Sequence, residues 1–455
     1  MEPAISTTGA RPAKGETLEL TVDSLAYGGA GVARLNGYVV FVAEGIPGDR
    51  VRAVVQKSKR AYAEARAVEI LEPSPDRLAA RANHPGVAWQ VLPYERQLEA
   101  KQAQVEDALR RIGRLEGFEL EPILPAVATW RYRNKLEYSF GTGPGGRLVC
   151  GFHAAGRWEE IVEVSDCLLA SAPANAARER VVQWCRAHGL TAYDRRTQDG
   201  RLRNLVVREG RRTGELQVRL VTAPGELARA GLIEAVGSVE GVLWTQTDSV
   251  AETTQAGQTE LLAGSDRLDE EIGGMRLRIS SSAFFQTNTE MAERLYQLAI
   301  DYAQPAGTDR VYDLYCGIGT IGLLMAPRAA EVWGLELVEE AIADAIANAR
   351  LNEVDNVHFF AGDVRLALRE LVAQAGRPDI LVVDPPRSGL SQKVVRRIIE
   401  AAPRRIVYVS CNPTTLAPNA AQLVEAGYAL ERVQPVDMFP QTPHIEAVAL
   451  LTRSA

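Results

Sequence analysis

The first part of the chain alternates between hydrophobic and polar residues, and turn-forming pairs separate the alternating runs. Between Glu16 and about Glu72 this pattern predicts five short strands. The turns are marked by Gly28-Gly29, Asn36-Gly37 and Pro47-Gly48-Asp49, and the stretch from Pro73 to Pro75 ends the last strand. Five strands of this length are typical of a small closed β-barrel, an architecture that many oligonucleotide-binding proteins share.

The pattern changes twice further along. Helical periodicity from Pro93 to Arg114 predicts a connecting helix. From about Glu121 to Ile279, β-branched runs such as LVVREG and LQVRLVTA predict strands, with one helical stretch near Pro173 to His188. We expect a second domain here, mostly β or α+β.

From Phe285 onward, strands and helices alternate strictly. The predicted strands lie at 310–314, 332–335, 357–360, 380–383, 406–409, 428–435 and 447–451, with helices between them, for example at 339–351 and 392–401. This rhythm predicts an α/β fold, a doubly wound, Rossmann-like parallel sheet with helices on both faces.

Composition narrows the class of protein. No stretch approaches the roughly 20 apolar residues of a membrane span, and the N-terminus lacks the apolar run of a secretory signal. We therefore expect a cytoplasmic protein. The cysteines are scattered, without a C-x-x-C pair, and predict neither disulfides nor a metal site; they are Cys150, Cys167, Cys185, Cys316 and Cys411.

The net charge of −7 is unevenly distributed. Residues 286–455 hold 21 acidic and 15 basic residues, so the preceding 285 residues carry only −1. Basic side chains gather in two stretches, Arg50 to Arg66 and Trp130 to Arg157. These stretches are either surfaces that contact nucleic acid or solvated strand edges whose Lys and Arg side chains block aggregation.

A cofactor site is predicted where the first strand of the sheet runs into a glycine turn, in DLYCGIGTIG. Asp313, Glu336 and Asp363 end three successive strands around this turn, and Glu336 is placed to accept the hydroxyls of a ribose. Three carboxylates fit a nucleoside without phosphates, which describes S-adenosylmethionine better than a dinucleotide. The alternative is that each acid caps the following helix.

Candidate chemistry follows at the next strand ends, in DPPRSGL, YVSCNPTTL and DMFPQTPHIEAVALL. Cys411 follows a strand and precedes a helix, and a helix N-terminus is expected to lower the pKa of a thiol. His444 and Glu446 lie just before the last strand. We expect Cys316, inside the glycine turn, to be a packed residue.

Together, SSAFFQTN (281–288), DLYCGIGT, DPPRSGL, SCNPTTLAPN and the late PHIE resemble the RNA 5-methyluridine methyltransferase family. The opening barrel resembles the TRAM RNA-binding domain of that family, and WRYRNKLEYSFG (130–141) resembles the start of its central domain. The resemblance covers nearly the whole chain. It implies a TRAM barrel over residues 9–72, a connecting helix and RNA-recognition domain over 73–280, and a catalytic methyltransferase domain over 281–455.

Carried over residue by residue, the resemblance makes Cys411 the nucleophile and Glu446 the general base. It assigns the S-adenosylmethionine pocket to Gln286, Tyr315, Glu336, Asp363 and Asp384. A thiolate that adds to C6 of uracil makes C5 nucleophilic toward the methyl sulfonium, and a carboxylate then removes the C5 proton. The uridine must leave its stack to react. A barrel with a sizeable central domain suggests 23S ribosomal RNA as the substrate of a monomeric enzyme, and a tRNA as the alternative.

Some members of this family carry an iron–sulfur cluster on four cysteines. Here the corresponding stretch, residues 81–90, has no cysteine, and Cys167 alone stands near the place of the fourth ligand. One thiolate cannot hold such a cluster, so we predict none and expect Cys167 to be a packed residue.

Three other functions explain less of the sequence. A nicotinamide-dependent dehydrogenase would need a G-x-G-x-x-G loop. A non-catalytic RNA-binding protein would have no use for a thiol and a carboxylate in one crevice. A 5-methylcytidine methyltransferase shares the thiol chemistry, but it needs a group for the exocyclic amine of cytosine, and no second catalytic cysteine motif is present.

Overall fold

The computed structural model describes residues 11–249, 254 and 256–453, so residues 9 and 10, where the first domain was predicted to begin, lie outside it. The opening strands form a closed barrel in the order β1-β2-β3-β5-β4, which confirms the predicted barrel. Its strands are β1 (Thr17–Leu25), β2 (Gly31–Leu35), β3 (Tyr38–Ala43), β4 (Arg50–Ser58) and β5 (Tyr62–Glu72). Alternate side chains such as Leu18, Leu20 and Val22 fill the interior, as the period of two requires.

A short helix, η1 (Pro85–Val87), precedes α1 (Tyr94–Asp107), which runs into a π-helical turn, η2 (Ala108–Ile112). Val105 and Leu109 are buried in the same core as the C-terminal sheet. The following strand, β6 (Glu119–Leu120), pairs with that sheet at its edge. Residues 94–120 therefore pack on the C-terminal part of the molecule, although the predicted division counts them with the central domain. A local pattern predicts a helix but not the core that the helix covers.

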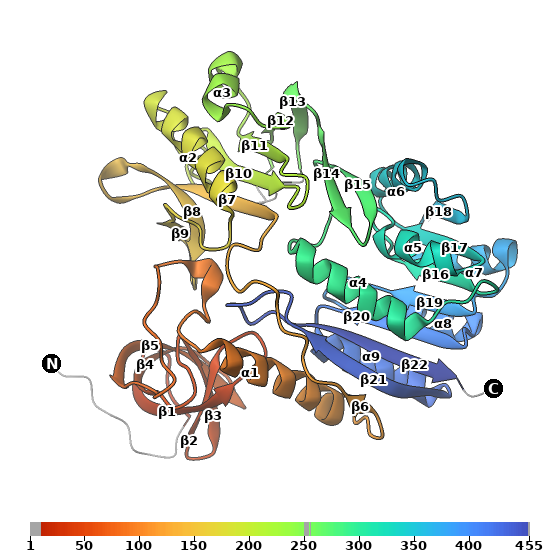
Figure 1. Ribbon diagram of the computed structural model, residues 1–455. Helices are drawn as coiled ribbons and strands as arrows, with labels where there is room; N and C mark the ends of the chain where they lie inside the picture. Colours follow the sequence, from red (N-terminus) through yellow and green to blue (C-terminus); the bar gives the residue numbers. More distant parts are fainter. Residues whose placement is uncertain (1–10, 250–253, 255, 454–455) are drawn as a thin grey trace.

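The central domain is a seven-stranded sheet in the order β13-β12-β11-β10-β7-β8-β9, with helices α2 and α3 packed against it (Figure 1). Its elements are β7 (Lys135–Thr142), η3 (Pro144–Gly146), β8 (Leu148–Ala154), β9 (Arg157–Glu163), α2 (Ala172–Ala187), β10 (Leu202–Glu209), β11 (Leu216–Thr222), α3 (Arg229–Val236), β12 (Gly241–Gln246) and β13 (Gln258–Gly264). The next hairpin, β14 (Arg267–Ile272) and β15 (Met275–Ser280), places Ile272, Leu277 and Ile279 in the C-terminal core.

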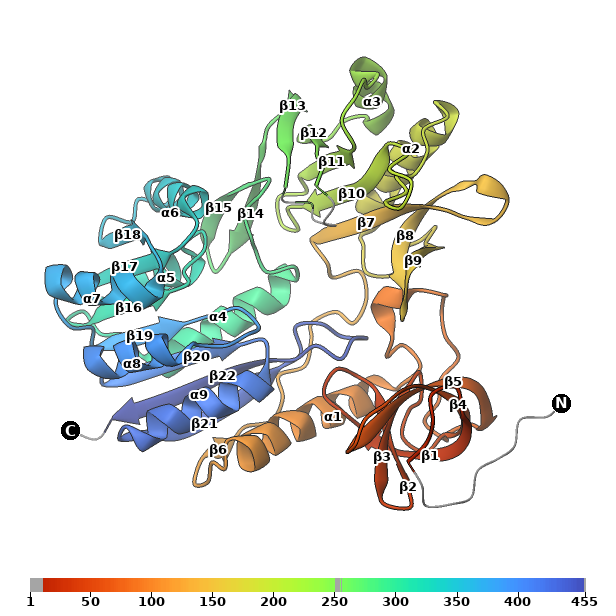
Figure 2. The same ribbon diagram turned by 180° about the vertical axis from the view of Figure 1, so that it is seen from behind.

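The C-terminal sheet has the order β18-β17-β16-β19-β20-β22-β21-β6. Its elements are α4 (Thr289–Ala303), β16 (Arg310–Leu314), α5 (Thr320–Met325), η4 (Ala326–Arg328), β17 (Glu331–Glu336), α6 (Glu339–Leu351), β18 (Val357–Ala361), α7 (Val364–Ala375), β19 (Ile380–Val383), α8 (Gln392–Ala401), β20 (Arg405–Ser410), α9 (Pro413–Glu425), β21 (Tyr428–Val436) and β22 (Glu446–Arg453). Helices cover both faces, as the views from the front and from behind show (Figures 1 and 2). The predicted doubly wound fold is thus confirmed.

One strand departs from the all-parallel prediction. β22 runs antiparallel to both β20 and β21. The loop between β21 and β22, residues 437–445, contains no helix, and so short a connection can join only antiparallel neighbours. The start of β22 therefore lies at the same edge of the sheet as the ends of the parallel strands.

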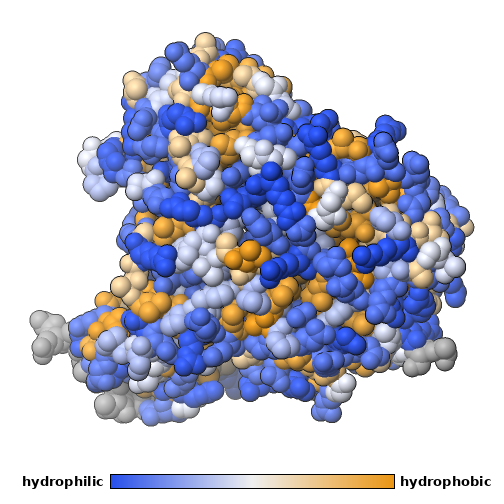
Figure 3. Space-filling view, viewed as in Figure 1, coloured by the Kyte–Doolittle hydropathy of each residue, from blue (hydrophilic) through white to orange (hydrophobic). Residues whose placement is uncertain are grey.

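Within the described residues, no helix is long and apolar enough to cross a membrane. The face of the molecule in Figure 3 is largely hydrophilic, with hydrophobic residues in separate patches.

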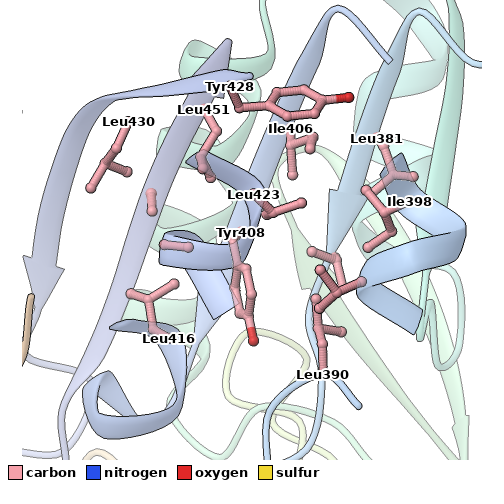
Figure 4. Packing of buried hydrophobic residues seen from close by; sticks show 14 of the residues in the cluster. Leu381, Leu390, Ile398, Ile406, Tyr408, Leu416, Leu423, Tyr428, Leu430 and Leu451 are labelled. Carbon is pink, nitrogen blue, oxygen red and sulfur yellow. The ribbon is translucent and has the colours of Figure 1, made fainter. Parts of the chain in front are cut away.

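The core beneath α8 and α9 holds the strands that carry the candidate chemistry. Figure 4 shows Ile398 of α8 and Leu423 of α9 among the side chains that rise from the sheet, such as Ile406 and Leu451. Each of these four side chains is at least 99% buried, which contributes about 1.5–3 kcal/mol apiece. This packing fixes the ends of β19 and β20.

Candidate active site

Cys411 and Glu446 meet because of the antiparallel last strand. Ser410, at the end of β20, pairs with Ala447 near the start of β22. Directly outward from this pair, Cys411 follows Ser410 and Glu446 precedes Ala447. The thiol and the carboxylate therefore share one sheet edge, and Asp384 follows the end of the adjacent strand β19.

Cys411 is half-buried at the N-terminus of α9. Asn412 caps this helix by accepting a hydrogen bond from the Thr414 amide at 3.0 Å. The prediction that the helix lowers the pKa of the thiol is wrong for this site. Burial, then Glu446 and Asp384, raise the pKa of Cys411 to about 11, and Arg387 only partly opposes them. The thiol is thus neutral in the free enzyme.

Glu446 is 3% exposed, and its Oε2 atom finds no hydrogen-bond partner among the residues described. Burial, followed by the charge of Asp384, raises the pKa of Glu446 well above its ordinary value. Burial also raises the pKa of Asp384 to about 7. A buried carboxyl group with a free oxygen and a raised pKa is suited to accepting a proton during a reaction.

Arg387 is a site residue that the sequence reasoning missed, although it lies within DPPRSGL. Its guanidinium is 3.3 Å from Nδ1 of His444, and its carbonyl accepts a hydrogen bond from the Asn412 side chain at 3.0 Å. Burial, followed by the charges of Arg387, Arg133 and Lys101, lowers the pKa of His444 to about 4. His444 is therefore neutral, and the positive charge beside Cys411 comes from arginine.

The glycine turn and Glu336 are joined at the other end of the site. One Glu336 oxygen accepts from the Gly317 amide at 3.2 Å, and the other accepts from Leu337 and Val338 at 2.7 and 3.0 Å. A side chain at Gly317 would meet nothing within 4 Å, so the turn has open space beside it. Tyr315, partly buried with φ of +64°, begins this turn. An open backbone turn beside a carboxylate fits the ribose of S-adenosylmethionine.

Two of the three strand-end acids have hydrogen-bond partners within the protein. Asp313 is fully buried and accepts from the Gly322 amide at 2.9 Å, so it holds the glycine turn in place. Asp363 caps α7 through the Arg365 amide and pairs with the Arg365 guanidinium. The capping alternative thus describes Asp363 in this structure, and a role in binding the cofactor stays a prediction.

Gln286 connects the catalytic and central domains. It is 6% exposed, and its backbone carbonyl accepts a hydrogen bond from the Asn134 side chain at 2.9 Å. Asn134 also donates to the Thr289 hydroxyl at 2.9 Å. Asn288, in the same motif as Gln286, donates to the Met438 carbonyl at 2.9 Å. The motifs WRYRN, SSAFFQTN and DMFP therefore meet at one junction.

The 437–445 loop, which leads into Glu446, is held from several elements, and it reaches toward the barrel and central domain in both ribbon views (Figures 1 and 2). Lys101 of α1 forms a fully buried ion pair with Asp437 at 2.6 Å. Gln97 of α1 exchanges two hydrogen bonds with Gln441, both at 2.9 Å. The hydroxyl of Tyr132 donates to the Pro440 carbonyl at 2.9 Å. The 437–445 loop therefore joins α1 and the segment that contains Tyr132 to the strand that begins at Glu446.

Cys167 is fully buried, far along the chain from the catalytic motifs. Its Sγ atom lies 3.2 Å from Nε2 of His84, whose Nδ1 accepts from the Gly86 amide. Nε2 must then carry the proton and donate to sulfur. Among the described residues, no three His, Cys, Asp or Glu side chains could hold a metal ion together. These residues do not fit a four-cysteine cluster, and the absence of a cluster stays a prediction.

Comparisons with known proteins agree with this geometry. Residues 250–454 match the family described as tRNA (Uracil-5-)-methyltransferase, and residues 13–68 match the TRAM domain. An uncharacterized RNA methyltransferase of Halalkalibacterium halodurans is 38% identical over 447 residues, 96% of this chain and 97% of that protein. One from Bacteroides thetaiotaomicron is 39% identical over 449 residues, 93% and 98% of the two chains.

Among solved structures, the Pyrococcus abyssi tRNA (uracil-54, C5)-methyltransferase in complex with S-adenosyl-L-homocysteine is similar, with a TM-score of 0.77 and 28% identity. The match covers 95% of this chain and 100% of that one. Fold and site together define an S-adenosylmethionine-dependent methyltransferase. The chain belongs to the RNA uracil-C5 methyltransferase family and carries a TRAM domain near its N-terminus. The predicted family and enzyme class are confirmed.

Proposed function

We propose that this enzyme methylates C5 of a uridine in 23S ribosomal RNA through a covalent bond between Cys411 Sγ and C6 of the base, with Glu446 as the general base. The observation that carries the proposal is the strand register: Ser410 pairs with Ala447, so that Cys411 and Glu446 are the next residues at the edge where the cofactor turn also lies. S-adenosylmethionine, bound along Gln286, Tyr315, Glu336, Asp363 and Asp384, supplies the methyl group on a positively charged sulfur.

The electrostatics of the site suit an ordered reaction. The thiol of Cys411 has a pKa of about 11 in the free enzyme, so the nucleophile is inactive until positive charge accumulates around it. Arg387 already acts in this direction. When its proton passes to solvent, Sγ adds to C6, and the electron pair of the C5–C6 bond shifts onto C5 and O4 as an enolate, which makes C5 nucleophilic.

Methyl transfer leaves a saturated C5 that still carries its proton. The Oε2 atom of Glu446 has no hydrogen-bond partner within the described structure, and Glu446 begins the strand that pairs with the end of β20, directly before Cys411. Glu446 accepts the C5 proton, the C5–C6 double bond forms again, and the Cys411 thiolate leaves C6. Burial that raises the pKa of Glu446 makes it a stronger base than an exposed glutamate.

A tRNA is the second candidate substrate, because the Pyrococcus abyssi enzyme, which has the same overall architecture, is a tRNA uracil-54 methyltransferase. Mapping 5-methyluridine in total RNA of a deletion strain decides between the two: the site that disappears from 23S ribosomal RNA or from tRNA is the target. Loss of no site would contradict the proposed activity. A cytoplasmic location and a monomeric state also stay predictions.

The covalent mechanism is tested with Glu446→Gln. The amide cannot accept the proton, so the enzyme should still add Cys411 and transfer the methyl group, and then stall. We expect a protein–RNA adduct, one methyl group heavier than its parts, that survives denaturing electrophoresis. Cys411→Ala alone should abolish turnover while cofactor binding persists, and in the double variant no adduct should form.

Glu431→Gln is the matched control, since Glu431 is an exposed carboxylate on the neighbouring strand β21. It should turn over like the parent enzyme. Release of free methylated RNA by Glu446→Gln at close to the parent rate, or clear activity of Cys411→Ala, would contradict the proposal.

A further inference from the structure

A turn of the TRAM barrel reaches the catalytic loop. The segment Ala26–Ala30, between β1 and β2, closes with a hydrogen bond from the Ala26 amide to the Ala30 carbonyl at 2.8 Å. Gly29 in this turn has φ of +94°, and a Cβ atom placed on it would lie 2.8 Å from Cβ of Pro443. Pro443 belongs to the 437–445 loop, three residues before Glu446. Only glycine allows so close an approach.

The turn and the loop rest on the same helix. Gln104 of α1, which is 8% exposed, donates to the carbonyls of Leu25 and Ala26 at 3.3 and 3.2 Å. On the same face of α1, one and two turns earlier, Lys101 and Gln97 hold the loop. The barrel turn is therefore fixed relative to Cys411 and Glu446.

This turn presents an aromatic side chain. Tyr27 is 40% exposed, the largest side chain of the turn. Burial of its other part raises the pKa of the phenol, and the charges of Arg387, Cys411 and Glu446 also act on it. Because Gly29 of the same turn packs against Pro443, three residues before Glu446, Tyr27 lies at the rim of the site that Cys411 and Glu446 form, with part of its surface open to solvent.

We propose that Tyr27 is a positioning residue for the RNA, on whose ring a base next to the target uridine stacks while that uridine lies in the active site. The inference rests on the proposed function, because it takes Cys411 and Glu446 to mark where the uridine binds. A flipped uridine leaves its neighbours without a stacking partner, and an aromatic side chain replaces one for any base. The barrel would then form part of the catalytic site as well as binding RNA at a distance from it.

The test uses the full chain with 23S ribosomal RNA and tRNA transcripts that contain 5-fluorouridine. Fluorine at C5 cannot leave as a proton, so the covalent adduct accumulates and reports productive placement of the base. Tyr27→Ala should raise the RNA concentration for half-maximal adduct formation about 10-fold or more. Tyr27→Phe, which keeps the ring, should behave like the parent. Val68→Ala, at an exposed apolar position elsewhere on the barrel (59% exposed), is the control and should change nothing.

Two further measurements separate stacking from a structural role. Tyr27→Ala should leave the maximal rate of adduct formation, S-adenosylhomocysteine affinity and the unfolding midpoint unchanged. With unfluorinated RNA, an abasic site beside the methylated uridine should weaken RNA binding by the parent enzyme as much as the Tyr27→Ala substitution does. The same abasic site should not weaken RNA binding by Tyr27→Ala any further.

Other results overturn the inference. An unchanged RNA requirement of Tyr27→Ala, or a loss that Tyr27→Phe shares, excludes stacking on Tyr27. A loss accompanied by a lower unfolding midpoint and weaker S-adenosylhomocysteine binding indicates a structural role. Failure of the parent enzyme to form any adduct overturns the proposed function itself, and with it the role proposed for Tyr27.

Discussion

Asp313 is a buried acid whose environment differs sharply from that in the unfolded chain. One oxygen accepts from the Gly322 amide, and Oδ1 has no partner within the described structure. Burial raises the pKa of Asp313 from 3.8 to about 7, with smaller contributions from Asp384 and Glu336. Its proton is therefore held by the folded state at pH values where the unfolded chain releases it.

The sign of the resulting pH dependence follows from linkage. Between pH 4 and pH 7 Asp313 binds more protons in the folded state than in the unfolded state, so its contribution to the free energy of unfolding should fall as pH rises through this range and level off above it. Asp313 alone contributes as much as about 4 kcal/mol to this fall, at 1.36 kcal/mol per pKa unit. Asp384, whose pKa is also raised to about 7, adds a fall of the same sign.

Asp313→Asn should remove this contribution from the plot of unfolding free energy against pH, because the amide still accepts from Gly322 but does not titrate. Chemical denaturation at a series of pH values measures this, with Asp301→Asn, at an exposed position at the end of α4, as the control. An unchanged slope between pH 4 and pH 7 in Asp313→Asn would show that Asp313 is not the group that titrates.

At the scale of elements, α1 shows what the sequence could not reveal. Its periodicity predicts a helix, and Gln97, Lys101 and Gln104 would normally be placed on a solvent-facing side. In the structure these polar side chains are buried, and they hold the catalytic loop and the barrel turn. Their partners in the catalytic loop and the barrel turn lie more than 70 residues away along the chain, so no local pattern predicts these contacts.

The Lys101–Asp437 pair gives an element-scale prediction. Lys101→Met removes one member of a fully buried pair and leaves the Asp437 carboxylate without its cation, which should lower the free energy of unfolding by about 3–5 kcal/mol. The turnover rate should also fall, because the loop that places Glu446 loses its anchor. Denaturant unfolding and methyl transfer by the remaining folded enzyme measure the two effects.

Lys101→Met combined with Asp437→Leu should recover most of the stability, since an apolar pair often replaces a buried ion pair at little cost. Glu99→Gln, at an exposed position of the same helix, is the control. Equal stability of Lys101→Met and the double variant would show that the charge of Asp437 is not the cause.

Strand direction marks another limit of sequence reasoning. The strand that begins at Glu446 was predicted, as were the strand ends at Asp384 and Cys411. Its antiparallel direction was not, because direction depends on the neighbouring strand and on the connection. The candidate site could still be assembled from the motifs, since the residues that carry the chemistry are local in sequence. Arg387 and Tyr27 were missed because their contacts with the site are made only in three dimensions.

At the scale of the whole molecule, the positive charge of the stretch Arg50 to Arg66 is largely neutralised by acidic side chains of the barrel. Arg50 pairs with Glu19 and Glu72, and Arg52 with Glu19 and Glu69. Lys57 pairs with Glu64, and Arg66 pairs with Glu44. Strand pairing creates most of these contacts, for Arg52 lies opposite both Glu19 and Glu69 in register. The sequence shows a basic stretch, but only the sheet reveals the acids beside it.

Two basic side chains of the stretch Arg50 to Arg66 differ from these paired ones. Lys59 and Arg60, in the turn between β4 and β5, are exposed and form no ion pair with any described residue. Exposed ion pairs stabilise a fold by only about 0–1 kcal/mol, but a paired arginine is less available to a phosphate. The alternative of a solvated strand edge thus suits Arg50 and Arg52, and the RNA-contact alternative suits Lys59 and Arg60.

This division predicts different salt dependences for two double variants. Each phosphate contact contributes about 0.7–0.9 to the slope of log K against log salt concentration. Lys59→Ala with Arg60→Ala should therefore weaken RNA binding and reduce the slope by about 1–2, because two phosphate contacts are lost. Arg50→Ala with Arg52→Ala removes the same charge from the same barrel, yet it should leave the slope nearly unchanged. Titrations of 23S ribosomal RNA and tRNA transcripts at several salt concentrations measure both slopes, with S-adenosylhomocysteine affinity as the check on folding. Equal slopes for the two variants would show that the ion pairs do not decide which barrel cations meet the RNA.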